Sequence, residues 1–153
     1  MRIGLISDTH GYLDPRVEKI FAGVDHILHA GDIGPDSLIA ELEVIAPVTA
    51  VLGNNDSSPA FPLTQVVAFD GRKFLIHHIV TPRALHSDLK RRIAREQPDM
   101  VVFGHSHKPF SETIGGVHFL NPGYAGQPRF NQPRSVAVLE WDAKELRPQF
   151  IEL

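Results

Sequence analysis

The sequence predicts an α/β domain in which two β-sheets pack together and carry helices on their outer faces. Short apolar runs alternate with helical patterns over residues 2–52, which favours parallel strands joined by helices. Further along, Asp70-Gly71 lies between two strand-like runs and is a strong signal for an antiparallel hairpin. The chain has 153 residues and 42% hydrophobic content, which suits a single domain over residues 1–153.

The first third of the chain contains helix-start and helix-stop signals between apolar runs. Asp14 is a capping residue followed by proline at the first helical position. Val17, Ile20 and Phe21 then recur at helical spacing before Gly23. In chain order, the expected elements are a strand over residues 2–7, a helix from Asp14 to about Gly23, a strand over 25–29, a helix from Asp36 through Leu42 and a strand over 48–52.

The rest of the chain combines one helix with many strands. Thr81 is followed by proline and repeats the helix-start pattern. Leu85, Leu89 and Ile93 recur every four residues, so the helix is expected to continue to about Glu96. The expected strands cover residues 65–69, 72–78, 100–103, 109–114, 117–120, 135–141 and 146–151.

The composition restricts the chemistry and the location of the protein. The chain has no cysteine, which excludes disulfides, thiolate ligands and cysteine nucleophiles, whereas nine histidines can supply nitrogen ligands. Fifteen basic and eighteen acidic side chains give a net charge of −3, which provides no global attraction to nucleic acid or anionic membranes. No apolar run approaches membrane-span length, and residues 1–7 form a strand rather than a secretion signal, so we expect a cytoplasmic protein without membrane contact.

Polar clusters follow five of the expected strands. Ligands of α/β proteins bind outside the carboxyl ends of the strands, so these clusters are expected to form one site. Seven nitrogen or oxygen donors exceed the needs of one ion and suit two divalent ions about 3.5–4 Å apart, with Asp32 as the first choice for a shared carboxylate. The candidate metal ligands are Asp8, His10, Asp32, Asn54, His77, His105 and His107.

Each cluster taken alone also has a simpler interpretation. Asp8 can cap a turn, Asn54 can belong to a turn with left-handed backbone, and His77 can be a half-buried strand histidine. His29, three residues before Asp32, is interpreted as a packed strand histidine, with orientation of a metal ligand as the alternative. The shared position of all five clusters at strand ends favours a metal site over five coincidences.

The ordered motifs resemble those of the calcineurin-like metallophosphoesterase superfamily, and most closely its small YfcE-like phosphodiesterase branch. The superfamily pattern consists of the motifs D-x-H, GD, GN-x-D, H and GH-x-H. This chain resembles it, with similar motifs in the same order over nearly its whole length. A later run resembles the N-P-G-S and G-Q-P-R motifs of that branch. The matching residues are Asp8 and His10, Gly31-Asp32, Gly53-Asn54-Asn55-Asp56, His77, Gly104-His105-Ser106-His107, Asn121-Pro122-Gly123 and Gly126-Gln127-Pro128-Arg129.

The resemblance implies a four-layer α/β/β/α sandwich of two mixed β-sheets with a dinuclear metal centre. It also implies a phosphodiesterase in which a metal-bridging hydroxide attacks a small phosphoester. Manganese is the first expectation for both ions, and iron, zinc or nickel are the alternatives for such nitrogen and oxygen donors. By this resemblance, Asp8, His10, Asp32 and His107 hold one ion, and Asp32, Asn54, His77 and His105 hold the other.

Three residues depart from the family pattern. Asn55 stands where protein-phosphatase relatives carry a histidine that protonates or stabilises the leaving oxygen, so that acid is absent. His78 stands where the branch usually has glycine, and Tyr124 replaces the serine of N-P-G-S. Asn54 and His78 are the expected catalytic residues, with the alternative that His78 points away from His77 along the strand. Asn54, Asn55 and Tyr124 are the expected substrate contacts.

Two other functions fit the same motifs. The retromer subunit that shares the family's fold is a protein-binding scaffold with a degraded metal site, whereas every ligand position is filled here, which favours catalysis. A nuclease is the second alternative, although the basic run at Lys90, Arg91, Arg92 and Arg95 is interpreted as a solvated helix face. The expected partner is therefore a small phosphoester rather than nucleic acid, and the apolar residues of the β-rich second half leave a homo-oligomer interface open.

Overall fold

The computed structural model describes residues 1–153 as two five-stranded β-sheets packed face to face. The first sheet contains β1 (Arg2–Ile6), β2 (His26–His29), β3 (Val48–Ala50), β9 (Ser135–Trp141) and β10 (Leu146–Glu152). The second contains β4 (Thr64–Phe69), β5 (Arg72–His77), β6 (Met100–Val102), β7 (Phe110–Ile114) and β8 (Val117–Asn121). The helices are α1 (Arg16–Ile20), α2 (Ser37–Glu43) and α3 (Ser87–Glu96).

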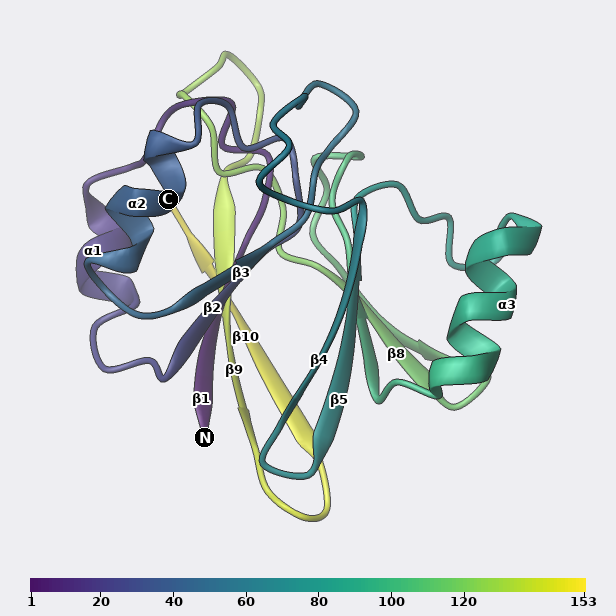
Figure 1. The fold of residues 1–153 in the computed structure, drawn as a ribbon. Coiled ribbons are helices and arrows are strands. Elements are labelled where there is room, and N and C mark those ends of the chain that lie inside the picture. The colour runs from purple at the N-terminus through teal and green to yellow at the C-terminus, as the bar shows by residue number, and fades with distance from the viewer.

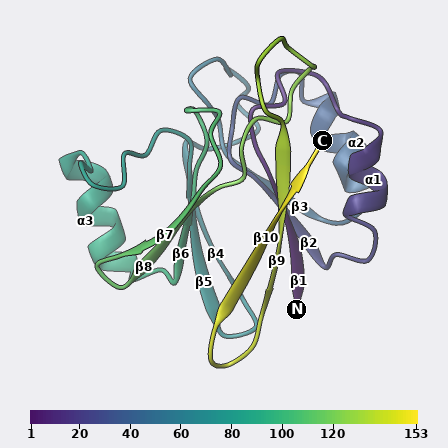
Figure 2. The ribbon, with the colours of Figure 1, turned by 180° about the vertical axis from the view of Figure 1, so that it is seen from behind.

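The helices lie on the outer faces of the sandwich. Figure 1 shows α1 and α2 outside the first sheet and α3 outside the second. Figure 2, the view from behind, shows β10 at the edge of the first sheet nearest the viewer, and the C-terminus lies beside α1 and α2. The four-layer α/β/β/α arrangement implied by the family resemblance is confirmed.

Both sheets mix parallel and antiparallel strands. The first has the order β10-β9-β1-β2-β3, in which β1, β2 and β3 are parallel and β9 is antiparallel to β1. The second has the order β4-β5-β6-β8-β7, in which β5, β6 and β8 are parallel. The loops that leave the carboxyl ends of these parallel strands gather at the top of Figure 1, where they can form one site.

Three apolar clusters fill the spaces between the four layers. Phe21 and Leu42 belong to the cluster between the first sheet and its two helices, and Trp141 belongs to the cluster between the sheets. Leu89 and Ile93 join α3 to the second sheet, and burial of each stabilises the fold by about 1.5–3 kcal/mol. The sandwich therefore holds the loops at its top on rigid elements.

Helix α3 starts later than the sequence pattern predicts. The expected start at Thr81 is wrong, because residues 81–84 form a turn in which the Ala84 N–H donates to the Thr81 carbonyl. The helix begins after His86, whose backbone is extended and whose ring accepts a hydrogen bond from the Leu89 N–H. It ends at Glu96, and the next residue, Gln97, has a left-handed backbone.

The predicted hairpin is present. The Asp70-Gly71 turn has φ angles of 45° and 78°, both in the left-handed region as in a type I′ turn, and the flanking strands are antiparallel.

No helix in the fold combines the length and apolar character needed to cross a lipid bilayer.

Candidate metal centre

Polar side chains from both sheets meet in the loops at the top of the sandwich. Asp8 and His10 follow β1, Asp32 follows β2, His78 follows β5, and His107 lies in the loop after β6. We call these five residues the His/Asp cluster. Asp8, Asp32 and His78 are at most 3% exposed, whereas His10 and His107 are partly exposed and form its outer side.

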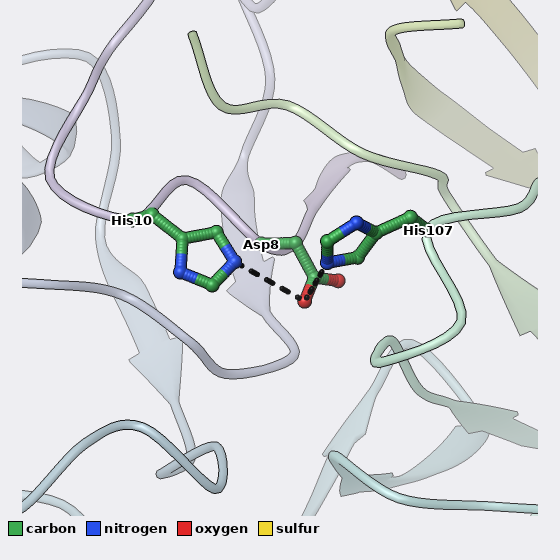
Figure 3. A group of neighbouring side chains, drawn as sticks. All are labelled: Asp8, His10 and His107. Carbon is green, nitrogen blue, oxygen red and sulfur yellow. Dashed lines mark ion pairs between the residues drawn. The ribbon is translucent and has the colours of Figure 1, made fainter. Parts of the chain in front are cut away.

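Distances within the His/Asp cluster are those of ligands around a shared space. The Asp8 Oδ1 atom lies 3.4 Å from His107 Nε2, 3.8 Å from His78 Nε2 and 3.9 Å from His10 Nε2. The Asp32 Oδ2 atom lies 3.4 Å from His78 Nε2 and 3.8 Å from His10 Nε2. Figure 3 shows the rings of His10 and His107 on either side of the Asp8 carboxylate, with a nitrogen of each directed at it.

Three buried atoms of the His/Asp cluster have no hydrogen-bond partner, namely Asp8 Oδ1, His10 Nε2 and His78 Nε2. In Asp8 and His78, the second polar atom of the side chain is held by hydrogen bonds. Asp8 Oδ2 accepts hydrogen bonds from Ser7 Oγ at 2.8 Å and from the His105 N–H at 3.2 Å. His78 Nδ1 donates to the Ala30 carbonyl at 2.7 Å, which leaves the Nε2 lone pair facing the cluster. Because an unpaired buried polar atom is costly, this arrangement fits a bound cation.

The two carboxylates have opposite environments. Burial raises the pKa of Asp8, and this effect exceeds the opposing effects of His78 and the Ser7 hydrogen bond. Burial also acts to raise the pKa of Asp32, but hydrogen bonds from the backbone N–H and side-chain amide of Asn55, both 2.9 Å long, hold that pKa below its usual value. Asp32 is thus kept ionised by its neighbours, and a cation would favour the ionised form of Asp8.

The backbone around the cluster is strained. Positive φ angles occur at Asp8 (57°), His10 (46°), Asp32 (54°), His105 (71°) and His107 (62°). A left-handed conformation costs a residue with a side chain about 1–2 kcal/mol. Strain of this kind persists where the surrounding structure imposes it, and its concentration at these loops marks a functional site.

Close packing also requires glycine beside the buried carboxylate. A Cβ atom on Gly104 would lie 2.1 Å from Ser7 Oγ and 2.6 Å from Asp8 Oδ2. The loop after β6 can therefore approach Asp8 only without a side chain at this position. Asn121 holds the same loop, because its amide donates to the Gly104 carbonyl at 3.0 Å and to Ser106 Oγ at 3.1 Å.

An open cavity of about 490 Å³ lies over the His/Asp cluster. Asn54 and His105 line it, and His105 Nδ1 lies 3.1 Å from Asn54 Oδ1. Both residues are exposed, so they form the solvent side of the site. The residues that line the cavity are His10, Asp32, Asn54, Asn55, His105, His107 and Arg129.

The structure places His77 outside the His/Asp cluster, although it was predicted as a metal ligand. Its Nδ1 lies 2.8 Å from Thr64 Oγ1, and its ring lies 6.1 Å from that of His86 on the side of α3. His78 occupies the position expected of His77. Successive side chains of a strand point to opposite faces, so only one of two adjacent histidines can face the site. The motifs pointed to His77, whereas His78 is the member of the pair that faces the cluster.

Of the other predicted substrate contacts, Tyr124 is buried, whereas Asn55 lines the cavity. Tyr124 is fully buried, its hydroxyl donates to the Gln127 carbonyl at 3.0 Å, and its ring packs against that of His107 at 4.8 Å. It therefore supports a cluster residue from behind. The Asn55 side chain faces the cavity, but its amide donates to Asp32 and orients that carboxylate.

Arg129 also lines the cavity, although it was not predicted as a site residue. Its guanidinium carbon lies 5.0 Å from the centre of the Tyr124 ring, and its exposed side chain lines the cavity. The G-Q-P-R run was a signal for it, because an arginine near metal ligands is a natural contact for an anionic group.

His29 links two of the ligand loops. It is fully buried, its Nε2 lies 2.9 Å from Thr9 Oγ1, and its Nδ1 accepts a hydrogen bond from the Gly31 N–H. Thr9 lies between Asp8 and His10, and Gly31 precedes Asp32. Burial lowers the pKa of His29 to about 3, so the ring is neutral at pH 7. Both interpretations of His29 thus apply, since it is packed and it also holds the loops that carry the cluster.

Comparisons with known proteins agree with this geometry. Residues 1–144 match the family model described as the calcineurin-like phosphoesterase superfamily domain. The chain is 36% identical to a probable metallophosphoesterase of Methanothermobacter thermautotrophicus, covering 99% of this chain and 92% of that protein. It is 32% identical to phosphodiesterase YfcE of Escherichia coli, covering 93% of this chain and 89% of that protein.

Solved structures show the same fold. A structure described as a novel archaeal phosphodiesterase is 28% identical, with a TM-score of 0.78 and coverage of 99% of this chain and 100% of that one. Vps29 of Entamoeba histolytica in complex with Zn²⁺ has a TM-score of 0.77 at 22% identity, with 99% of each chain covered. The family match and the curated relatives, which are named as a probable metallophosphoesterase and a phosphodiesterase, lead to one conclusion: the chain belongs to the calcineurin-like phosphoesterase superfamily.

Proposed function

We propose that this protein is a phosphodiesterase that hydrolyses a small phosphoester with two divalent metal ions. The observation that carries the proposal is the convergence of unpaired Asp8 Oδ1, His10 Nε2 and His78 Nε2 on one buried space beneath an open cavity. Asp8 Oδ1 lies within 4 Å of both histidine nitrogens, and a cation among these atoms would satisfy polar groups that are otherwise buried without a partner. The relatives named metallophosphoesterase and phosphodiesterase support the same activity.

The ligand set follows the resemblance with one exchange. We assign Asp8, His10, Asp32 and His107 to one ion, and Asp32, Asn54, His78 and His105 to the other. His78 thus replaces His77. Asp32 as the shared ligand is supported by its Oδ2 atom, which lies within 3.8 Å of both His10 Nε2 and His78 Nε2. Asp8 lies close to histidines of both groups and is the alternative shared ligand.

When bound, two divalent ions lower the pKa of water to near neutrality and neutralise charge on the phosphoryl group. Nitrogen and oxygen donors without sulfur favour manganese in our proposal, with iron, zinc or nickel as alternatives. Elemental analysis of the purified protein, with anomalous scattering from crystals, identifies the metal directly.

The chain's own residues position the substrate and the ligands. The exposed Asn54 amide and the Arg129 guanidinium line the cavity, where both can donate hydrogen bonds to nonbridging phosphate oxygens. In the reaction, an oxygen–phosphorus bond forms from water as the bond to the leaving oxygen breaks. No histidine stands at position 55 to deliver a proton to that oxygen, so esters with good leaving groups are the favoured substrates.

Hydrolysis of bis-p-nitrophenyl phosphate tests the proposal. The metal-depleted protein is assayed before and after addition of Mn²⁺, beside the variant Asp32→Asn. We expect Mn²⁺ to restore turnover in the parent protein and Asp32→Asn to remove it. A parent protein without metal-dependent turnover contradicts the proposal and favours the scaffold function.

A nuclease is separated from this function by its substrate. Salt-sensitive cleavage of oligonucleotides would support it. The structure gives this alternative little support, because the arginines of α3 are paired within the helix: Arg91 contacts Asp88, and Arg92 and Arg95 contact Glu96. These pairs reduce the free positive charge that nucleic-acid backbone contacts require.

A further inference from the structure

Strand β4 is an edge of the second sheet with no partner on its outer side. It pairs only with β5. The two-residue type I′ turn makes Phe69 and Arg72 a hydrogen-bonded pair. In an antiparallel ladder, hydrogen-bonded and non-hydrogen-bonded pairs alternate along the strands. The backbone N–H and C=O groups of Thr64, Val66 and Ala68 therefore point away from β5. The opposite strand agrees. Lys73 lies opposite Ala68, and its carbonyl points away from β4, where it accepts a hydrogen bond from the Asp99 N–H.

These outward groups find no partner within the chain. Among the backbone hydrogen bonds outside the helices and ladders, none involves Thr64, Val66 or Ala68. The three helices lie to either side of β4 in Figure 1, and none covers it. A six-residue strand with a free edge is a template for another strand.

The other sheet edges are blocked in ways that β4 is not. Strand β10 carries Arg147, Pro148 and Glu152, and Pro148 has no N–H to donate. Strand β7 carries Glu112 in an ion pair with Arg83. Strand β3 is three residues long. In contrast, the sequence of β4 is TQVVAF, without charge or proline.

We propose that β4 pairs antiparallel with β4 of a second copy of this chain, about a two-fold axis at Val66. This register places Val66 opposite Val66 and Thr64 opposite Ala68, so each outward N–H and C=O gains a partner. The residue on the axis faces its own copy, so a charge at that position would be destabilising, and the strand as a whole carries no charge that could oppose pairing.

The exposed leucine before β4 supports the same partner. Leu63 is 63% exposed and directly precedes the free edge of β4. Extending the proposed register by one residue places Leu63 opposite Phe69 of the second copy. The pairing thus covers an exposed apolar side chain in addition to satisfying backbone groups, and it is independent of the metal centre.

Sedimentation of the purified protein from about 1 to about 200 µM tests the proposal. We expect the wild type to reach twice the chain mass of 17.0 kDa. Ala68→Pro removes one outward N–H, whereas Ala68→Ser keeps it and serves as the matched control. We expect dimerisation to weaken at least about tenfold in Ala68→Pro and to be unchanged in Ala68→Ser.

A second pair of variants tests the axis. Val66→Lys places two positive charges opposite each other across the axis. Val44→Lys is the matched control, because it adds the same charge at the C-terminal end of α2, where Val44 is 82% exposed. We expect only Val66→Lys to be monomeric, with circular dichroism showing that it folds. If neither edge variant folds, hydrogen exchange of wild-type protein decides: the amides of Val66 and Ala68 gain protection as concentration rises. A wild type that stays monomeric, a dimer unaffected by folded edge variants, or exchange independent of concentration each overturns the proposal.

Discussion

The two sheets of the sandwich contribute different groups to the His/Asp cluster. The first sheet supplies both carboxylates, Asp8 and Asp32, together with His10. The second sheet supplies imidazoles alone, His78 and His107. Attraction for a cation therefore resides in the loops of the first sheet, and the second sheet completes the coordination. The site exists only because the sheets pack face to face. Variants of residues from each sheet can therefore test the separate contribution of each sheet.

The largest effect is expected from loss of a first-sheet carboxylate. Asp8 lies within 4 Å of three histidines, and Asp8→Asn removes its charge while keeping its shape. Turnover of bis-p-nitrophenyl phosphate should fall about 10³-fold or more, because several kcal/mol of charge stabilisation is lost with the metals. Asp36→Asn, which alters an exposed carboxylate outside the cluster, is the control. Turnover of Asp8→Asn within a few fold of wild type would refute the assignment.

Adjacent histidines of the second sheet should differ sharply. His78→Asn removes a cluster nitrogen and should lower turnover about 100-fold. His77→Asn removes a contact with Thr64 on the opposite face and should leave turnover within about threefold. Steady-state kinetics at saturating Mn²⁺ compare the two variants. The reverse order would restore the assignment based on the motif.

A pH effect on stability should arise beneath the first-sheet loops. Burial lowers the pKa of His29 from 6.5 to about 3, so at intermediate pH the unfolded chain binds a proton that the folded chain excludes. Above pH 6.5 the neutral ring does not reduce the free energy of unfolding. As the pH falls below 6.5, this free energy decreases by about 1.4 kcal/mol per pH unit, or by about 2 kcal/mol at pH 5.

Urea unfolding of metal-free protein at several pH values measures this slope. His29→Asn keeps hydrogen-bonding groups but does not titrate, so its free energy of unfolding should fall less between pH 6.5 and 5. Equal slopes in the two proteins would show that His29 does not cause the dependence.

The smallest effect is expected from a residue that orients a carboxylate without binding metal. Asn55→Ala removes the side-chain hydrogen bond to Asp32 Oδ2 and leaves the backbone bond to Oδ1 in place. The apparent affinity for Mn²⁺ should weaken about tenfold, which is the smaller end of the effect expected when a residue that hydrogen-bonds a metal ligand is lost. Titration of activity with Mn²⁺ measures this change. An unchanged midpoint with reduced turnover would instead point to direct contact between Asn55 and the substrate.

Much of the architecture could be predicted because it depends on local patterns. Apolar runs such as Met100 to Phe103 mark buried strands, and Asp70-Gly71 marks a hairpin, since each signal acts over a few residues. The start of α3 could not be predicted in this way. Thr81 with its following proline resembles a helix start, but it forms an isolated turn, and the cap is supplied by His86.

The contacts of the site were less predictable than its motifs. Tyr124 was expected to touch the substrate, yet it lies beneath His107, because burial depends on the packing of a distant loop. Arg129 reaches the cavity through the same loop, and the G-Q-P-R run that contains it did not show that its side chain would face the site. Which side of a loop faces a site is decided by contacts between segments far apart in the chain.

The sequence by itself determined the set of donors: aspartates, asparagines and histidines at strand ends, and no cysteine. It also determined that His77 and His78 point in opposite directions, because side chains alternate along a strand. Only the tertiary structure decided which of them faces Asp8 and Asp32. That choice depends on which face of β5 packs against the first sheet and which lies toward α3, and no local property of the two adjacent histidines encodes it.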